Sequence, residues 1–369
     1  MFISNLSLTT FRSYKNLELE LTPGISIFIG RNGEGKTNII ESILYLSFLS
    51  SHRVSSDQPL VQLGSASAYI RAKTQLPDRE VLVELEINSE KANRARINQN
   101  PARSQKEIFG IVQAIYFSPE DLDLVRGDPS ERRKFIVQLL ILRSPRLAGV
   151  ISDYERAVRQ RNSLLKSRAG TESLAAWDEQ VANFGGEIIA ARLQALKDFE
   201  PIFQEIYRDI SSEKPAFINY KSSIEEPTLN PADNTLKILE RMKTTRAAEM
   251  ERGLTLTGPH RDDLLLNLGD HLVKGYASHG ESWSIALSLK LATYKLLEKD
   301  GLKPILILDD VFSELDEERR IHLIKLANSA EQTFITVAVE NDLPKELSGN
   351  RFLVKSGQVS KISKLTEVN

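Results

Sequence analysis

The segment from Gly30 to Thr37, GRNGEGKT, constrains this chain more than any other part of it. It fits the pattern G-x-x-x-x-G-K-[ST], whose glycines let successive backbone N–H groups turn toward an anion. An apolar run over residues 25–29 precedes it and a helical pattern over residues 38–48 follows it, which is the strand–loop–helix context that the pattern requires. The sequence therefore predicts a phosphate-binding loop in an α/β fold. The alternative is an ordinary glycine turn.

The side chains of this segment allow more detailed predictions. We expect Lys36 to reach the β- and γ-phosphates of a nucleotide and Thr37 to ligate Mg²⁺. Backbone N–H groups of the loop and of the first helical turn are expected to bind the remaining phosphate oxygens. The predicted nucleotide-binding residues here are Gly30, Arg31, Asn32, Gly33, Glu34, Gly35, Lys36, Thr37 and Asn38.

A second apolar run, over residues 304–308, ends in the carboxylates Asp309 and Asp310. Such a run is typical of a strand buried on both faces of a parallel sheet, and ligands bind at the carboxyl ends of these strands. We expect Asp309 to hold Mg²⁺ opposite Thr37, and Asp310 to orient or deprotonate an attacking water. Lys36, Asp309 and Asp310 are thus the predicted catalytic residues. The alternative is a strand that merely ends in solvated acids.

The order of motifs along the chain narrows the class. Most of the chain separates Lys36 from Asp309, whereas compact P-loop kinases and GTPases carry the acidic strand much sooner. Residues 277–282, ASHGES, resemble a degenerate ABC signature, and residues 313–316, SELD, resemble the ABC D-loop. This order of motifs is similar to that of ABC-type ATPases of the chromosome-maintenance kind. The predicted fold is α/β, an ABC-type P-loop ATPase head with an inserted compact helical lobe.

The signature-like segment adds three predicted nucleotide-binding residues, Ser278, Gly280 and Glu281. Ser278 and Gly280 suit the start of a helix, where free N–H groups can bind a phosphate. The alternative is a helix cap without a ligand, because Ser and Gly cap many helices. In ABC-type ATPases the signature contacts the γ-phosphate held by a partner subunit. The resemblance therefore implies a head-to-head homodimer that closes on two ATP molecules.

Composition excludes several classes of protein. The chain has no cysteine and therefore no disulfide, and it has no apolar run of 18 or more residues, so we expect no membrane association. The N-terminus begins in a strand pattern without a basic segment, which predicts a cytoplasmic protein without a signal peptide. The five histidines show no metal-ligand spacing, so no zinc site is predicted.

Charge distribution bears on nucleic-acid binding. The net charge of −2 is not that of a bulk DNA-binding protein, but phosphate contacts need only local basic patches. The alternative for each patch is a solvated face that also carries Glu and Asp. The basic clusters lie at residues 132–134, at residues 156–168, and at Arg71, Lys73, Arg94, Arg96 and Arg103.

Periodicity divides the chain into three parts. Residues 1–118 are predicted to form the N-terminal half of the head, residues 119–250 the helical lobe, and residues 251–369 the C-terminal half. A helical period runs from residue 174 to 210, where Gly185, Gly186 and Pro201 are expected to interrupt the helix. Further strands are predicted at residues 253–256, 262–268 and 271–276.

Longer motifs identify a family. The chain resembles the RecF family of bacterial recombination mediators over nearly its whole length. Departures from the family pattern are Val137 in place of an acid, His279 and Glu281 in place of frequent glutamines, and Thr336 where ABC proteins often carry a switch histidine. The motifs that carry the resemblance are residues 11–14, 30–38 with Glu41, 119–135, 257–263, and 309–316 with Arg319 and Leu323.

The resemblance implies an ATP-switched clamp that closes on double-stranded DNA near single-strand gaps. It implies ATP and Mg²⁺ as cofactors, RecR and RecO as partners in loading RecA, and slow, DNA-stimulated ATP hydrolysis. By analogy with related heads, Arg12 is predicted to lie near the nucleotide, and Arg53 to link DNA and nucleotide.

Two other interpretations stay open. A P-loop phosphotransferase acting on a small molecule would be a monomer with substrate-dependent turnover. A binding module would be stabilised by ATP without turnover. The paired Asp309 and Asp310 argue against the module, because an inert site needs no acid that orients water.

Overall fold

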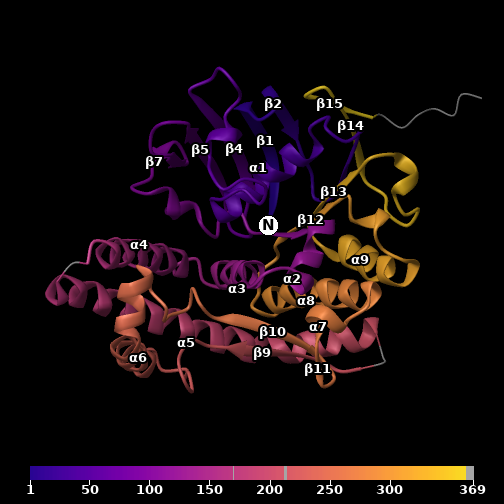
Figure 1. Cartoon of the computed structure of the whole chain (residues 1–369). Helices are drawn as coiled ribbons and strands as arrows, with labels where there is room; N and C mark the ends of the chain where they lie inside the picture. The colour runs from indigo at the N-terminus through magenta and orange to yellow at the C-terminus, as the bar shows by residue number, and fades with distance from the viewer. Residues whose placement is uncertain (169, 212–213, 363–369) are drawn as a thin grey trace, which may run out of the picture. The chain divides into compact units, whose positions relative to one another are not determined.

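The computed structural model describes residues 1–168, 170–211 and 214–362. The chain folds into two compact units. Unit 1 comprises residues 1–121 and 293–369, and unit 2 comprises residues 122–292. Unit 1 is therefore assembled from both ends of the chain, and Figure 1 shows its N-terminal strands in indigo beside C-terminal strands in yellow.

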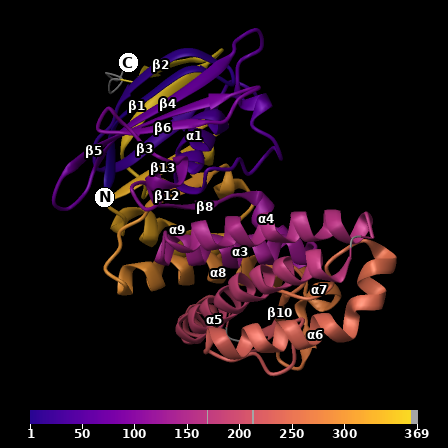
Figure 2. The same cartoon turned by 90° about the vertical axis from the view of Figure 1, so that its left-hand side faces the viewer.

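An antiparallel sheet forms one layer of unit 1, with strand order β2-β1-β4-β5-β6-β7. Burial alternates along its strands, so that one face joins the core and the other is exposed. Figure 2 shows strands of this sheet, β1, β4 and β6 among them, lying beside one another. The strands are β1 (Phe2–Phe11), β2 (Tyr14–Glu20), β4 (Ser67–Gln75), β5 (Glu80–Asn88), β6 (Arg94–Ile97) and β7 (Asn100–Pro101).

The second sheet of unit 1 has the order β15-β14-β3-β13-β12-β8. Neighbouring strands from β14 to β8 run parallel, and β15 pairs antiparallel at the edge. β12 and β13 are buried throughout, as the apolar run before Asp309 predicts. The strands are β3 (Gly24–Ile29), β8 (Ala114–Phe117), β12 (Ile305–Asp309), β13 (Gln332–Val337), β14 (Asn350–Lys355) and β15 (Gln358–Lys361).

Helix α1 (Lys36–Phe48) directly follows the phosphate-binding segment. Its apolar side chains, Ile40 and Ile43 among them, share one core with the inner face of the antiparallel sheet and with Phe28 and Phe334 of the parallel sheet. This core fixes the start of α1 against the parallel strands. The remaining helical elements of unit 1 are α9 (Glu317–Ser329), the end of α8 (His279–Lys299), and the short 3-10 turns at Gln58–Leu60, Gln105–Ile108, Pro119–Asp121, Val311–Ser313 and Glu340–Asp342.

Unit 2 is mainly helical, with one small antiparallel sheet of order β11-β10-β9. A buried ion cluster joins three of its helices: Arg161 of α4 donates to Asp178 of α5 and to Glu249 of α6, at 2.6 Å each. The elements are α2 (Leu122–Arg126), α3 (Pro129–Arg143), α4 (Leu147–Lys166), α5 (Thr171–Ile210), β9 (Ala216–Lys221), α6 (Pro231–Arg252), β10 (Asp263–Leu268), β11 (His271–Leu272), α7 (Val273–Tyr276) and most of α8.

The predicted interruption at Gly185 and Gly186 is wrong, because α5 is one helix from Thr171 to Ile210 with Pro201 inside it. The glycines serve helix packing instead. A Cβ on Gly186 would lie 2.5 Å from the carbonyl oxygen of Pro231 and 2.8 Å from the backbone nitrogen of Thr235. Both atoms belong to α6, so Gly186 allows the two helices to approach closely.

Two predicted strands are also wrong. Over residues 253–256 the backbone amides of Thr255 and Leu256 donate to side chains, to Asn162 at 2.7 Å and to Glu249 at 2.8 Å, and not to a neighbouring strand. The predicted strand at residues 271–276 ends after Leu272. Gly275 there has a φ of 93°, which extended backbone does not allow.

The predicted domain boundaries, after residues 118 and 250, do not coincide with those of the compact units. Residues 119–121 group with unit 1, and residues 251–292 group with unit 2. That residues 251–292 act as part of the ATPase head stays a prediction.

Candidate nucleotide site

The phosphate-binding loop joins β3 to α1 in the geometry that its sequence predicts. Gly35 has a φ of 117°, in the region that favours glycine, and it directly precedes α1. The buried hydroxyl of Tyr14 donates to the Gly35 carbonyl oxygen at 3.1 Å, and a Cβ on Gly35 would lie 2.8 Å from that hydroxyl. Tyr14 therefore supports the loop from behind and excludes a side chain at position 35.

Lys36 lies between the loop and the acidic strand. Its side chain is 3% exposed. The ammonium donates to the carbonyl oxygen of Gly30 at 2.7 Å and to Asn32 Oδ1 at 3.3 Å, and it lies 3.8 Å from a carboxylate oxygen of Asp310. A buried ammonium among oxygen atoms is suited to bind phosphate oxygens.

The two acids at the end of β12 have different surroundings. Asp309 is 6% exposed; it accepts a hydrogen bond from the Tyr116 hydroxyl at 3.1 Å and another from the Thr336 hydroxyl. Asp310 has a φ of 50° and a side chain that is 34% exposed. Its backbone N–H donates to the Thr336 carbonyl oxygen at 3.2 Å and to the Thr336 hydroxyl at 3.1 Å. Thr336 thus orients both acids.

Burial and the neighbouring charge of Asp310 raise the pKa of Asp309, although the hydrogen bonds from Thr336 and Tyr116 and the charge of Lys36 act against this. Burial, together with the Asp309 charge, also raises the pKa of Tyr116, so the hydroxyl keeps its proton and can donate. A divalent cation beside Asp309 would favour the charged carboxylate.

These groups open into one pocket of unit 1 with a volume of about 530 Å³, which is enough room for a triphosphate group. Asn32, Thr37, Asp309 and Asp310 line it, so the structure brings together four of the predicted site residues. The lining residues that the sequence analysis did not select as site residues are His52, Tyr116, Ser118, Pro119, Glu120, Ser313, Glu314, Ala338 and Asp342.

All lining residues of this nucleotide pocket belong to unit 1. Arg53, which the sequence analysis proposed as a link between DNA and nucleotide, also lines it. The His52 ring lies 4.8 Å from the Tyr116 ring, centroid to centroid. No sequence pattern indicated that β8 pairs with β12 and so brings Tyr116 to Asp309.

The donor set of the pocket fits Mg²⁺ shared with a nucleotide. Among the described residues, no group of three or more His, Cys, Asp or Glu side chains could hold a metal by itself. Mg²⁺ is commonly bound by one or two protein oxygens together with substrate phosphates. Thr37 and Asp309, which both line the pocket, offer a hydroxyl and a carboxylate for such a site.

Arg12 does not line the pocket. Its guanidinium forms two hydrogen bonds to the carboxylate of Glu41 on α1, at 2.6 and 2.7 Å, and donates to the Pro59 carbonyl oxygen at 3.0 Å. The Glu41 side chain is fully buried. Burial by itself raises the pKa of Glu41, but the hydrogen bonds from Arg12 and Ser51 and the charges of Arg12 and Arg53 bring it below its usual value. A direct contact between Arg12 and the nucleotide stays a prediction.

The signature-like residues belong to unit 2 and do not line the pocket either. Ser278 and Glu281 form a capping box at the start of α8: the Glu281 N–H donates to Ser278 Oγ at 3.2 Å, and the Ser278 N–H donates to Glu281 Oε2 at 2.8 Å. Glu281 also accepts from Lys214 at 3.3 Å. The bond from the Ser278 amide is the main cause that lowers the pKa of Glu281.

Gly280 lies within the first turn of α8, between the two capping residues. Ser278 is exposed, so its hydroxyl can be approached from outside unit 2. Glu281 already serves the cap, and its charge would oppose a phosphate beside it. A contact of Ser278, Gly280 and Glu281 with a nucleotide stays a prediction.

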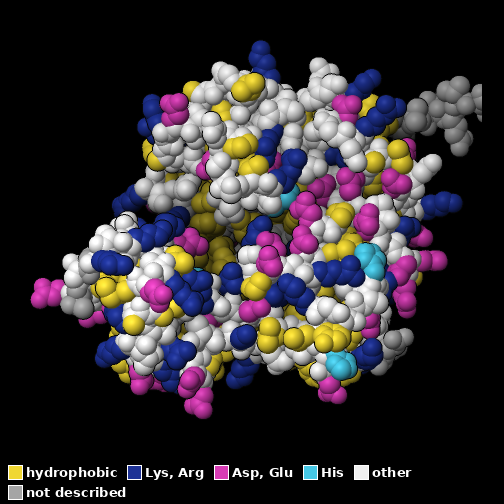
Figure 3. Space-filling view, in the orientation of Figure 1, with side chains coloured by type: hydrophobic (Ala, Val, Ile, Leu, Met, Phe, Trp, Pro, Cys, Tyr) yellow, Lys and Arg dark blue, Asp and Glu magenta, His cyan; other side chains and the backbone are white. Residues whose placement is uncertain are grey.

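Basic side chains are dispersed over the face that Figure 3 shows, where Lys and Arg alternate with Asp and Glu. No single basic field covers this face, in keeping with the net charge of −2. The described part of the chain contains no helix with the length and apolar character needed to cross a membrane.

Comparisons with known proteins find similar proteins over nearly the whole chain. The family model described as RecF/RecN/SMC N terminal domain matches residues 2–360. The chain is 45% identical to the DNA replication and repair protein RecF of Streptomyces avermitilis, over 98% of this chain and 100% of that protein. It is 46% identical to the protein of the same name from Rhodococcus erythropolis, over 98% of this chain and 97% of that protein.

Solved structures show the same likeness. The recombination mediator protein RecF of the RecFOR pathway, determined with ATP, matches with a TM-score of 0.90 and 28% identity, over 98% of each chain. An Smc head bound to the C-terminal winged-helix domain of ScpA matches with a TM-score of 0.58 and 17% identity, over 100% of this chain and 98% of that one. At that identity the Smc match shows the fold alone.

Proposed function

Since the chain belongs to the RecF family of DNA replication and repair proteins, we propose that it is a clamp that ATP closes on duplex DNA near single-strand gaps. The observation that carries the proposal is the pocket in which Thr37, Asp309 and Asp310 meet beside Lys36. Membership of the family implies ATP binding. DNA stimulation and slow hydrolysis belong to the proposal.

In this proposal each residue of the pocket has one task. Lys36 and the N–H groups of the loop bind phosphate oxygens of ATP. Thr37 and Asp309 hold Mg²⁺, which neutralises phosphate charge when it is bound. Asp310, whose carboxylate is partly exposed, orients or deprotonates the attacking water. Tyr116 and Thr336 keep the carboxylate of Asp309 in place.

The clamp itself requires two copies of the chain. We propose that Ser278 and Gly280 of one copy complete the site around ATP held by the other copy, so that the dimer forms only with ATP. The solved relative belongs to the RecFOR pathway, which supports RecO and RecR as partners in loading RecA. Hydrolysis then opens the dimer and releases DNA.

The test is ATP turnover at increasing protein concentration, with and without duplex or gapped DNA. Turnover per subunit should rise with concentration and with DNA, because the active site needs residues from two copies. Lys36→Met and Ser278→Arg should each abolish it. Turnover per subunit that depends neither on protein concentration nor on DNA would overturn the clamp and favour a phosphotransferase.

Mixing the two inactive variants makes this test sharper. A dimer of one Lys36→Met copy and one Ser278→Arg copy contains one site with both defects and one site with neither. The mixture should therefore regain activity that neither variant has alone. Failure to regain activity, in a mixture shown to form dimers, would count against a shared site.

A further inference from the structure

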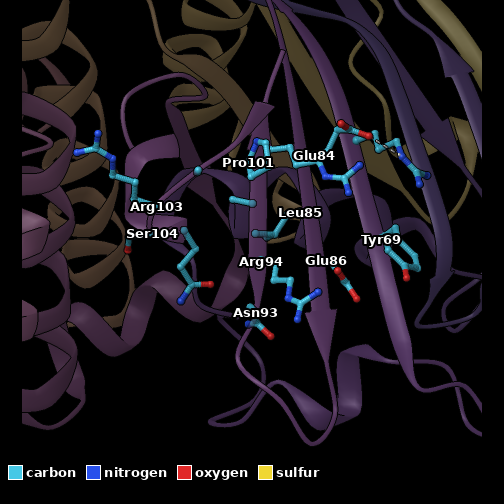
Figure 4. A pocket seen from close by; sticks show the side chains of 14 residues that line it. Tyr69, Glu84, Leu85, Glu86, Asn93, Arg94, Pro101, Arg103 and Ser104 are labelled. Atoms are coloured by element: carbon cyan, nitrogen blue, oxygen red, sulfur yellow. Dashed lines mark hydrogen bonds and ion pairs between the residues drawn. The ribbon is translucent and has the colours of Figure 1, made fainter. Parts of the chain in front are cut away.

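A second groove lies on the outer face of the antiparallel sheet of unit 1. Its volume is about 560 Å³, and its lining comes from β4, β5, β6, β7 and the segment after β7. Figure 4 shows Tyr69, Glu86 and Arg94 in a row across three neighbouring strands, as their pairing requires. The groove contains four of the five basic residues that form the third cluster in the sequence: Arg71, Arg94, Arg96 and Arg103.

Three of these arginines are free to bind a ligand. Arg71 is held by Glu84 at 3.2 Å and lies over the Tyr69 ring, 5.3 Å from its centroid. Arg94, Arg96 and Arg103 are exposed, and within the described ranges none of their guanidinium groups forms an ion pair. Glu84 lies opposite Arg96 in the sheet, but its carboxylate bonds to Arg71.

The arrangement suits an extended polyanion. Arg94 and Arg96 lie on the same face of β6, two residues and thus about 6.6 Å apart along the strand. Arg103 continues the basic lining beyond β7. Guanidinium groups bind phosphate oxygens through paired N–H donors, which favours a phosphodiester backbone as the ligand.

A protein segment fits the groove less well. The usual way to bind an extended peptide at a sheet is to add a strand at its edge. The edge strand here, β7, consists of Asn100 and Pro101, and proline has no N–H to donate. The edge is therefore too short and too poor in donors to pair with another strand.

We propose that this arginine groove, defined by Arg94, Arg96 and Arg103, binds the phosphate backbone of the DNA that the clamp encloses. This inference rests on the proposed function and assigns part of its DNA contact to named residues. Contacts to phosphates carry no sequence information, so binding through the groove is independent of DNA sequence. It is also sensitive to salt, because each contact releases counterions.

The experiment measures binding of the full chain, with ATP, to a duplex at several salt concentrations. The variant Arg94→Ala/Arg96→Ala/Arg103→Ala should lower affinity about 10²-fold at 0.1 M salt and reduce the slope of log K against log salt by about three, since each phosphate contact contributes about 0.9. The triple lysine variant keeps the charges and should keep most of the slope.

A matched control removes three exposed cations of unit 1 that do not line the groove: Lys15→Ala/Arg79→Ala/Lys361→Ala. It should change affinity much less than the groove variant does. Equal effects of the two alanine variants, or no effect of the groove variant, would overturn the DNA-binding role of the groove but not the proposed function. If the groove variant no longer binds polyglutamate but binds DNA as the wild type does, the groove is assigned to an acidic protein segment. That result would also overturn the proposal that the groove binds DNA. A wild-type chain that binds no DNA with ATP would overturn the proposed function itself.

Discussion

Tyr116 is the residue whose contact says most about the nucleotide pocket. It donates to Asp309, the predicted Mg²⁺ ligand, from a strand that enters the sheet next to β12. Groups that orient a metal ligand commonly affect metal affinity or activity about 10- to 100-fold. Tyr116 therefore acts as a positioning residue in the proposed mechanism.

We predict that Tyr116→Phe raises the Mg²⁺ concentration needed for half-maximal ATP turnover about tenfold, because Asp309 loses one of its two hydrogen bonds. Binding of ATP measured without Mg²⁺ should not change. Tyr294→Phe, at a tyrosine of the same unit that lines neither the nucleotide pocket nor the arginine groove, is the matched control. An unchanged Mg²⁺ requirement in Tyr116→Phe would contradict the positioning role.

Glu41 offers a prediction on pH. Its folded-state pKa lies below the ordinary value of 4.5, so its ion pair with Arg12 stabilises the fold fully above that value and is lost as pH falls through the folded pKa. Glu41→Gln should cost about 3 kcal/mol at pH 7 and less in acid. The check is the free energy of unfolding in urea, measured at pH 7 and at an acidic pH below the folded-state pKa of Glu41. Glu18→Gln on the exposed face of β2 is the control. An equal cost at both pH values would contradict the prediction.

The sequence indicated which residues meet at the nucleotide pocket better than it indicated their contacts. The phosphate-binding segment, Asp309 and Asp310 have local patterns, so their neighbourhood could be expected. Arg12 could not be placed, because only the folded chain shows that Glu41 occupies its guanidinium. Tyr116 carries no motif, and its importance arises from strand pairing.

At the scale of elements, the contact of α5 with α6 depends on Gly186. We predict that Gly186→Ala destabilises the protein by about 1–3 kcal/mol, because the new methyl group would meet backbone atoms of α6. Gly149→Ala in α4 is the matched control: nothing lies within 4 Å of its Cβ position, so it should stabilise by about 0.5–1 kcal/mol. Thermal unfolding should show a lower Tm for Gly186→Ala and a higher Tm for Gly149→Ala. Equal shifts in Tm would contradict the packing argument.

The same contact explains where element prediction failed. Local propensity treats paired glycines as a break, whereas in α5 their missing side chains serve tertiary packing. Residues 253–256 carry an extended pattern, but side chains of α4 and α6 take their amides. The strand before Asp309 was predicted well, because full burial leaves a continuous apolar run.

At the scale of the whole molecule, the predicted α/β head of the ABC type is confirmed by the family model and by the likeness to the solved RecF structure. The motif order carried this prediction, since the P-loop strand β3 and the acidic strand β12 lie far apart in sequence but belong to one sheet, in which β13 lies between them. The boundary after residue 292, where unit 2 ends, could not be predicted from the sequence. Helix α8 continues through this boundary without a break, so no turn or loop marks it.

Dimerisation by ATP gives a prediction at this scale. With ATP and Mg²⁺, the Tm should rise with protein concentration, because ligand and partner both bind only the folded state. Without nucleotide, and in Lys36→Met, the Tm should not depend on concentration. Scanning calorimetry over a hundredfold range of concentration tests this, and a Tm independent of concentration with ATP would argue for a monomer.

The position of β3 has a consequence for the order of events during synthesis. This strand leads into the phosphate-binding loop, yet both of its sheet neighbours, β13 and β14, are made much later, after the whole of unit 2. The backbone N–H of Gly357 even bonds to the loop, at the Glu34 carbonyl oxygen. Residues 122–292 can fold on the ribosome while β3 still lacks these two partners. A chain cut short by interrupted translation would thus lack a complete nucleotide site and could not take part in the proposed clamp.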